Sequence, residues 1–195
     1  MNIPPPYQVA DYAWTAMGIY WLVSARQSAK SKTNEPHVYR ILRLTILCTT
    51  FVLLLTTWLR FGPLGWRFVP ENPALEWAGV AVTFAGLGIT VWARICLGTN
   101  WSDKIVLKEN HELIRTGPYA FMRHPIYSGV LLAIAGTAVV EGEWRGVVAF
   151  CLLLATYAIK ARKEDQLLRA AFGQAFEKHL QQTGFLLPRV RIGAR

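Results

Sequence analysis

The sequence predicts an all-α integral membrane protein with about five transmembrane helices, a short C-terminal helical hairpin and an amphipathic tail helix on the cytoplasmic side. The chain has only 195 residues, and 53% of them are hydrophobic. Its apolar residues form long runs, and most of its basic residues lie between these runs. Such a chain is too apolar for an ordinary soluble domain and too short for several membrane domains, so we expect one membrane-embedded domain over 1–195.

Five apolar runs are candidate spans, and they cover roughly 9–25, 41–59, 75–97, 127–140 and 146–159. The second and third are long enough to cross about 30 Å of hydrocarbon. The first is marginal, and the last two are shorter and are joined only by 141–145. Two helices with so short a link form an antiparallel hairpin, which polar residues are expected to extend at its cytoplasmic end.

The basic residues favour one side of the predicted bundle. Eighteen Lys and Arg residues belong to the first and third connections and the tail, whereas Arg60, Arg67 and Arg145 belong to the second and fourth connections. Connections rich in Lys and Arg stay in the cytoplasm. The sequence therefore predicts a multi-pass protein with a cytoplasmic tail. The same distribution argues against a nucleic-acid partner, because the cations form no single basic face.

The tail predicts a further helix over 163–181. Leu168, Phe172, Phe176 and Leu180 recur every four residues, with charged residues on the opposite side. This spacing is typical of an amphipathic helix that lies on a membrane surface or covers a cytoplasmic site.

Polar residues concentrate in two segments that the predicted topology brings to the same side, 98–126 and 160–166. Pro125 suits the first turn of a helix. The unpaired backbone N–H groups of such a turn can bind a carboxylate, to which His124 and Tyr127 would add polar contacts. Alternatively, these side chains are interfacial anchors of the membrane helix. Their convergence with the second segment favours a functional site.

Lys160 and Glu164 are four residues apart, so they share one face if the last span continues as a helix. They form either a simple surface ion pair or part of a pocket where the hairpin meets the long connection. Their location favours the pocket.

Several motifs follow one another between 97 and 190: Asn100-Trp101-Ser102, His111-Glu112-Leu113 with Gly117 and Tyr119, Arg123-His124-Pro125-x-Tyr127-x-Gly129, and an acidic junction before Phe172-Gly173. This ordered series resembles the isoprenylcysteine carboxyl methyltransferase family and its relatives among the phospholipid methyltransferases. The resemblance implies a catalytic part over 75–195, preceded by N-terminal spans in 1–74.

The resemblance also implies S-adenosyl-L-methionine as cofactor, enclosed at the cytoplasmic face, and a lipophilic or lipidated acceptor that enters from the bilayer. Carried over by position, the cofactor-binding residues are His111, Glu112, Leu113, Ile114, Tyr119, His124, Pro125, Ile126, Tyr127 and Glu164. Glu164 would pair with the cofactor's amino group, the helix start near His124 would hold its carboxylate, and Tyr119 would pack on the adenine.

The sequence departs from the family pattern in two places. The family's paired glutamates are Glu164-Asp165 here, and Lys160 stands where the family has an arginine that positions the substrate. Lysine keeps the charge but lacks the bidentate fork. Lys160 and Arg123 are therefore the candidate catalytic residues that orient the acceptor, and Arg162 is another stand-in.

The favoured activity is O-methylation of a carboxylate such as a prenylated-cysteine C-terminus, because a carboxylate with a pKa near ~4 is already ionised and needs no general base. A phospholipid amine is the second acceptor class. A membrane reductase is disfavoured because the sequence has no Gly-rich dinucleotide loop, and a small transporter subunit because its spans are nearly free of charge. No metal site and no obligate protein partner are expected.

Overall fold

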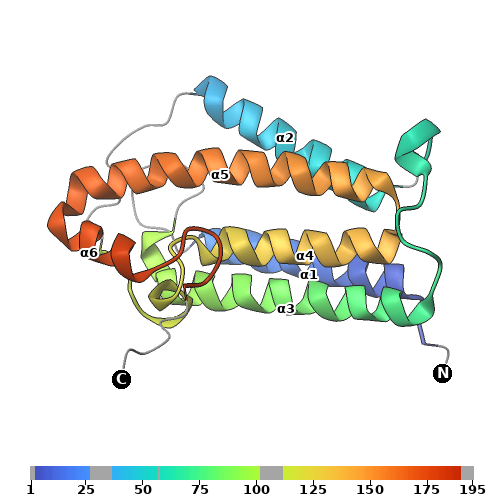
Figure 1. The fold of residues 1–195 in the computed structure, drawn as a ribbon, viewed down its shortest axis with the longest axis horizontal. Helices are drawn as coiled ribbons and strands as arrows, with labels where there is room; N and C mark the ends of the chain where they lie inside the picture. The colour runs from blue at the N-terminus through green and yellow to red at the C-terminus, as the bar shows by residue number, and fades with distance from the viewer. Residues whose placement is uncertain (1–2, 27–36, 57, 102–111, 190–195) are drawn as a thin grey trace.

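The computed structural model describes residues 3–26, 37–56, 58–101 and 112–189. These residues form helices and turns and contain no β-strand. Successive long helices run in opposite directions, so α1, α3 and α5 end on the side where α6 lies, which we call the tail side (Figure 1). In chain order the elements are α1 (Pro6–Ala25), α2 (His37–Leu55), η1 (Gly62–Gly65), α3 (Pro73–Leu97), η2 (Gly98–Asn100), η3 (Gly117–Ala120), α4 (Pro125–Glu141), α5 (Trp144–Phe172) and α6 (Gln174–Gln182).

Three of the described helices are long and apolar enough to cross a membrane, and these are α2, α3 with its continuation to Asn100, and α5. Helix α4 is apolar but has only 17 residues. Helix α1 has 20 residues and is not one of the three. The predicted helical membrane fold class is therefore present, and each predicted span overlaps a helix, although α2 ends at Leu55 and not at 59 as predicted. The number of five crossings stays a prediction.

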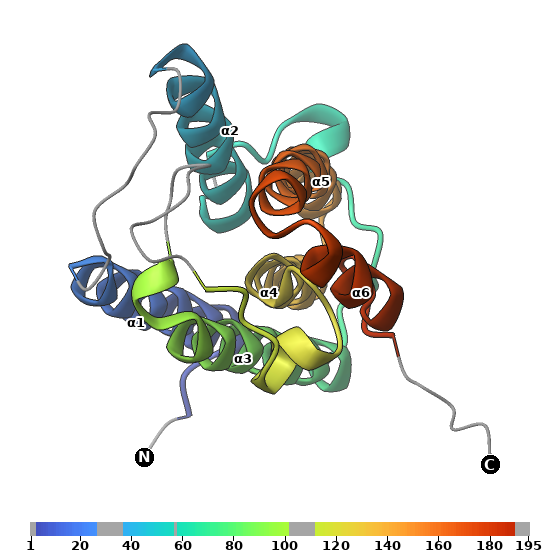
Figure 2. The same cartoon turned by 90° about the vertical axis from the view of Figure 1, so that its left-hand side faces the viewer.

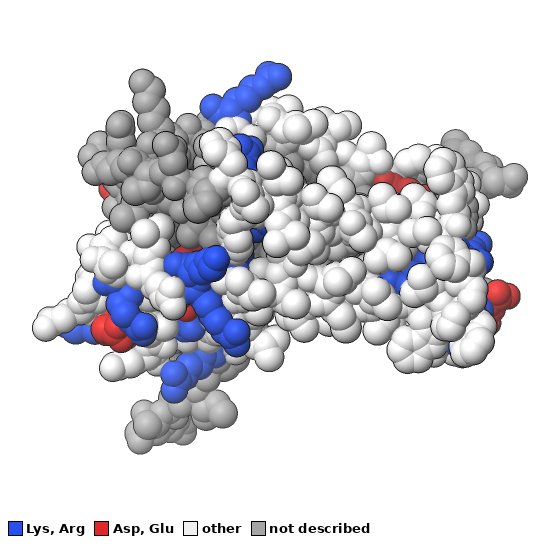
Figure 3. Space-filling view, turned by 90° about the horizontal axis from the view of Figure 1, so that it is seen from above, with Lys and Arg blue, Asp and Glu red and all other residues white. Residues whose placement is uncertain are grey.

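The outer surface of the bundle suits contact with lipid. Large apolar side chains point outward along the helices, among them Leu22, Val38 and Phe84. Figure 3 shows an uncharged belt across the middle of the bundle, and most of the visible Lys and Arg residues gather on the tail side. An apolar belt with cations at one edge is the pattern expected of a membrane protein.

Helices α3 and α4 pack more extensively than any other described pair. A Cβ atom at Gly86 would lie 2.4 Å from the backbone nitrogen of Ala133, so glycine lets the two backbones meet. Thr83 and Thr137 add a buried hydrogen bond, with their hydroxyl oxygens 3.1 Å apart. Trp14 of α1 donates its indole N–H to Thr137 at 2.9 Å. Figure 2 shows α4 between the α1–α3 side and the α2–α5 side, and these contacts fix its position.

Arg145, at the start of α5, holds α2 in place on the side opposite the tail. Its side chain is fully buried and donates to the backbone carbonyls of Leu53 at 2.8 Å and Thr56 at 2.7 Å, which lie at the end of α2. Glu141 and Glu143 pair with the same guanidinium. A buried charge is stable only when paired and hydrogen-bonded in this way. Arg145 thus joins α2 to the predicted α4–α5 hairpin.

The tail differs from its prediction. The sequence predicts one amphipathic helix over 163–181, but α5 continues to Phe172 and a separate helix, α6, follows Gly173. Gly173 has a φ of 48°, a conformation that glycine adopts readily, so the chain turns there. Phe176 and His179 of α6 are buried, which shows that α6 folds back onto the bundle.

Candidate active site

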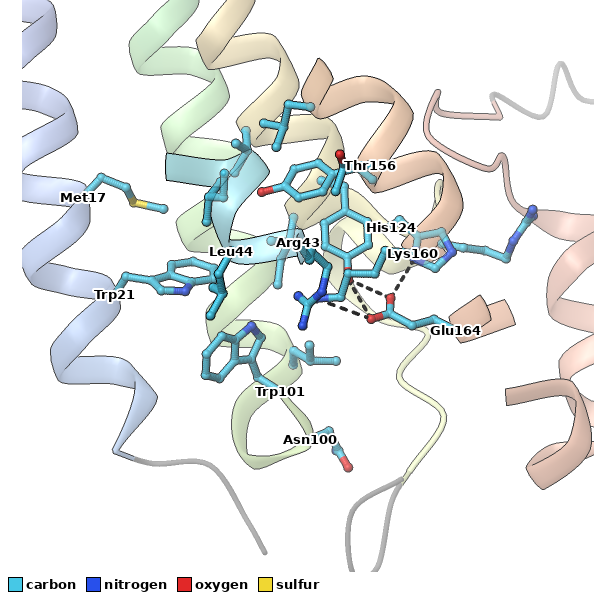
Figure 4. Close-up of a pocket in the computed structure, with 18 of the residues that line it drawn as sticks. Met17, Trp21, Arg43, Leu44, Asn100, Trp101, His124, Thr156, Lys160 and Glu164 are labelled. Atoms are coloured by element: carbon cyan, nitrogen blue, oxygen red, sulfur yellow. Dashed lines mark hydrogen bonds and ion pairs between the residues drawn. The ribbon is translucent and has the colours of Figure 1, made fainter. Parts of the chain in front are cut away.

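A cavity of about 500 Å³ lies on the tail side, between α1, α2, α4 and α5 (Figure 4). Its size is within the range of small-molecule sites. One wall is apolar and is formed by α1, α2 and the end of η2 with Trp101. The large side chains of this wall are Trp14, Met17, Trp21, Leu22, Leu44, Leu47, Phe51 and Trp101. The opposite wall carries polar side chains from the start of α4 and the end of α5.

Glu164 is the centre of the polar wall. The hydroxyl of Tyr127 lies 2.7 and 2.8 Å from its two carboxylate oxygens. His124 Nδ1 lies 3.6 Å from one oxygen, and Lys160 Nζ lies 3.8 Å from the other. Lys160 also sits over the ring of Tyr127, with Nζ 5.3 Å from the ring centroid. The predicted pairing of Lys160 with Glu164 is therefore present, and both side chains line the cavity.

Asp165 faces a different set of partners from its neighbour Glu164. His124 Nε2 lies 2.9 Å from one of its carboxylate oxygens, and Arg123 Nε donates to the other at 3.1 Å. Asp165 lies beyond the apolar part of α5. Burial works against ionisation of Asp165, but the hydrogen bond with His124 and the charge of Arg123 outweigh it and lower the pKa of the carboxyl group. Asp165 therefore holds Arg123 and His124 in position.

Arg123 connects the site to the tail. Its guanidinium donates to the carbonyl of Thr183 at 3.0 Å and lies over the ring of Phe185. Its backbone N–H donates to the carbonyl of Gly184 at 3.0 Å. Arg123 lines the cavity as predicted for an acceptor-orienting residue, but its charge is already engaged by Asp165 and the tail. These contacts fit better with a role in which Arg123 positions the tail segment 183–189.

Tyr119 closes the polar side of the cavity from η3. Its side chain is buried, and burial, together with the negative charge of Glu164, raises the pKa of the hydroxyl well above its usual value. The residue therefore stays neutral. Tyr119 packs with Ile126 and Ala93 in a small apolar cluster that joins η3 to α3 and α4.

The structure brings five of the sequence-predicted cofactor residues to the cavity: Tyr119, His124, Ile126, Tyr127 and Glu164. Four others do not line it. The backbone N–H of Glu112 donates to Asn100, Leu113 is half-buried, Ile114 packs against the cluster around Tyr119, and Pro125 occupies the first turn of α4. His111 lies outside the described residues.

The apolar wall was not predicted from the sequence. The recognised motifs lie between 97 and 190, yet α1 and α2 supply much of the cavity lining. One available signal was Arg43, a permanent cation inside the second apolar run. Arg43 is 7% exposed and lines the cavity.

Comparisons with known proteins agree with the motifs. The family model of phospholipid methyltransferases matches residues 75–175, which is more than half of the chain. A probable protein-S-isoprenylcysteine O-methyltransferase of Oryza sativa subsp. indica is 32% identical over 117 residues, which are 58% of this chain and 61% of that protein. The uncharacterized protein YpbQ of Bacillus subtilis is 30% identical over 104 residues, or 51% of this chain and 60% of that protein.

The chain thus spans about 60% of the length of these curated relatives. A solved structure of the eukaryotic intramembrane Ras methyltransferase, isoprenylcysteine carboxyl methyltransferase, superposes with a TM-score of 0.57. The alignment covers 96% of this chain and 69% of the other, at 20% identity, so it shows a shared fold. The predicted resemblance is confirmed: the chain belongs to the phospholipid methyltransferase family, whose relatives include the isoprenylcysteine carboxyl methyltransferases.

Proposed function

We propose that this protein is an S-adenosyl-L-methionine-dependent methyltransferase that acts on a lipophilic, membrane-partitioned carboxylate such as a prenylated-cysteine C-terminus. The observation that carries the proposal is the group of His124, Tyr127 and Glu164 on one wall of a cavity whose other wall is apolar. Family membership supports the same reaction class. The polar wall suits a charged cofactor, and the apolar wall suits a lipid chain.

The residues of the polar wall fit the charged parts of S-adenosyl-L-methionine. Glu164 supplies a carboxylate for the ammonium group, and the Tyr127 hydroxyl holds this carboxylate in place. The first turn of α4 supplies backbone N–H groups at the positive end of the helix, where a carboxylate binds well. The buried ring of Tyr119 supplies an aromatic surface for the adenine.

When bound, the cofactor would supply an electrophilic methyl group for transfer from its sulfonium sulfur to an acceptor oxygen, and the sulfur would leave as a neutral thioether. The protein's own contribution is to position and desolvate the acceptor. A carboxylate is ionised at neutral pH, so no side chain has to remove a proton. Lys160 provides a buried cation beside Glu164 that can orient the acceptor, and the apolar wall excludes water.

The acceptor's route follows from the position of the apolar wall. Leu22 of α1 and Leu44 of α2 both line the cavity and are exposed on the outer surface. In the described part of the chain, the cavity therefore opens sideways between α1 and α2, toward lipid. We place the polar wall at the cytoplasmic face, because the basic residues gather on the tail side.

Calorimetry on the protein purified in detergent tests the proposal. S-adenosyl-L-methionine should bind, and a Tyr127→Phe variant should bind it more weakly, because it cannot hold the carboxylate of Glu164 in place. A nicotinamide nucleotide should not bind. Binding of the nucleotide in place of S-adenosyl-L-methionine would instead indicate a membrane reductase.

A further inference from the structure

We propose that Arg43, on the second helix, is the residue that binds the carboxylate of the acceptor. This inference rests on the proposed function and assigns its acceptor-recognition residue. The resemblance to the family points to positions 123 and 160 for this role. The structure brings a third cation to the same cavity, from a helix outside the matched family region.

Arg43 lies on the inner face of α2. Arg43, Leu47, Thr50 and Leu54 are buried or half-buried and are spaced three or four residues apart, so they form one stripe along α2. The neighbours Ile41 and Leu42 point outward and are exposed. An arginine that merely reached for the polar edge of the membrane would not need to be on the inward stripe. Its place on that stripe turns a permanent charge toward the cavity.

Arg43 also lies at the boundary between the two walls. Figure 4 shows it between the apolar side chains of Trp21 and Leu44 and the polar side chains of Lys160 and Glu164. A lipidated carboxylate has its apolar chain and its charged group in that same order. With its chain against the apolar wall, its carboxylate would meet the Arg43 guanidinium beside Glu164, where the methyl donor is proposed to bind.

The charges of the cavity favour an anionic acceptor. Among the described residues that line it, Arg43, Arg123 and Lys160 are cations and Glu164 is the one carboxylate. The described lining therefore carries more cationic than anionic side chains. S-adenosyl-L-methionine carries a sulfonium charge as well. An ammonium acceptor would add a further cation to this desolvated space, whereas a carboxylate would balance it.

The other two cations are less suited to the role. Arg123 is held by Asp165 and the carbonyl of Thr183. Lys160 is a point charge next to Glu164. Arg43 offers a planar guanidinium, whose fork matches a carboxylate with two parallel hydrogen bonds. Arg43 would thus supply, from α2, the guanidinium fork that Lys160 lacks at the position where the family has an arginine.

The experiment compares two ligands that differ only in charge: N-acetyl-S-farnesylcysteine, which has a carboxylate, and its neutral carboxamide. Dissociation constants are measured for the whole protein in detergent and for its Arg43→Gln, Arg43→Lys and Arg40→Gln variants. Arg40 lies one turn earlier on α2 and is not among the cavity-lining residues, so it is the matched control. The affinity for S-adenosyl-L-methionine is measured in parallel as a marker of an intact site.

We expect the unaltered protein and Arg40→Gln to prefer the carboxylate by about 10- to 100-fold, the range of a charged hydrogen bond. Arg43→Gln should reduce this preference to roughly 3-fold or less, with the carboxamide affinity and S-adenosyl-L-methionine affinity preserved. Arg43→Lys should retain an intermediate preference, because the charge remains without the fork.

An unchanged preference in Arg43→Gln would overturn the assignment of Arg43 and leave the proposed function standing, provided that the unaltered protein still methylates the farnesylated carboxylate. Loss of S-adenosyl-L-methionine binding in Arg43→Gln would also overturn it, because Arg43 would then support the structure. Methylation of phosphatidylethanolamine vesicles, with no turnover of the farnesylated carboxylate, would overturn both the assignment and the proposed acceptor.

Discussion

The contact between α3 and α4 predicts opposite effects for the same substitution at two glycines one half-turn apart. In Gly86→Ala, the new methyl carbon would lie 2.4 Å from the backbone nitrogen of Ala133 and 2.5 Å from the carbonyl oxygen of Gly129. In Gly88→Ala, the methyl carbon would meet nothing within 4 Å. The two variants add the same atoms to the same helix, so Gly88→Ala is the control for Gly86→Ala.

The distances set the size of the effect. Ordinary van der Waals contact begins near 3.4 Å, so the two backbones at Gly86 must move apart by about 1 Å. Overpacking of this kind costs about 1–3 kcal/mol. Gly88→Ala should instead stabilise the protein by up to about 1 kcal/mol, because alanine has the higher helix propensity. We therefore expect a difference of about 1–4 kcal/mol in the free energy of unfolding between the variants.

The difference is measured by unfolding both variants in the same detergent. The candidate site should change as well, because Gly129, which contacts Gly86, lies two residues after Tyr127. A shift of α4 would move the Tyr127 hydroxyl away from Glu164. Gly86→Ala should therefore also weaken S-adenosyl-L-methionine binding. Equal stabilities for the two variants would refute the close backbone packing of α3 and α4.

Three further predictions concern the site, the tail and the topology. Glu164→Gln should weaken S-adenosyl-L-methionine binding by about 1.5–3 kcal/mol, measured by calorimetry, since a charged hydrogen bond is lost; unchanged affinity would remove Glu164 from the cofactor site. Burial first, and then the charges of Arg115 and Arg123, lower the pKa of His179 in the folded protein, so the unfolded chain binds the proton more readily. The stability of the α6 contact should therefore be present above the ordinary histidine pKa of about 6.5 and fall as the pH drops below it. Limited proteolysis of the tail should show this loss, and His179→Gln should flatten it; equal pH dependence in the variant would exclude His179 as its source. A reporter fused after Arg195 should be active in the cytoplasm, and activity only on the external side would reverse the proposed orientation.

The sequence predicted the positions of the helices well because each one contains an apolar run, although the ends of α2 and α5 differ from the predicted ends. Pro125 begins α4 as expected, and the link at 141–145 gives the hairpin. The division of the tail was harder to predict. Leu168, Phe172 and Phe176 keep the helical spacing through Gly173, and a single glycine is only a weak break signal within such a pattern. The turn is visible only in the backbone conformation of Gly173.

The polar wall could be predicted, whereas the apolar wall could not. His124 and Glu164 stand out because polar residues at the ends of apolar runs must have partners, and the topology placed both runs on one side. Trp21 and Leu44 look like any other membrane-facing residues in the sequence. Whether an apolar side chain faces lipid or a cavity depends on how the helices are rotated against one another, and spacing within one helix does not determine this.

A methyl-transfer assay with tritiated S-adenosyl-L-methionine tests the central claim most directly. The purified protein in lipid vesicles is supplied with N-acetyl-S-farnesylcysteine, and the product is then treated with alkali. We predict that the protein labels this acceptor and that alkali releases the label as volatile methanol, because the bond formed is a methyl ester. Label that resists alkali and resides in a phospholipid amine would contradict carboxylate methylation, and the absence of any transfer would contradict the proposed activity.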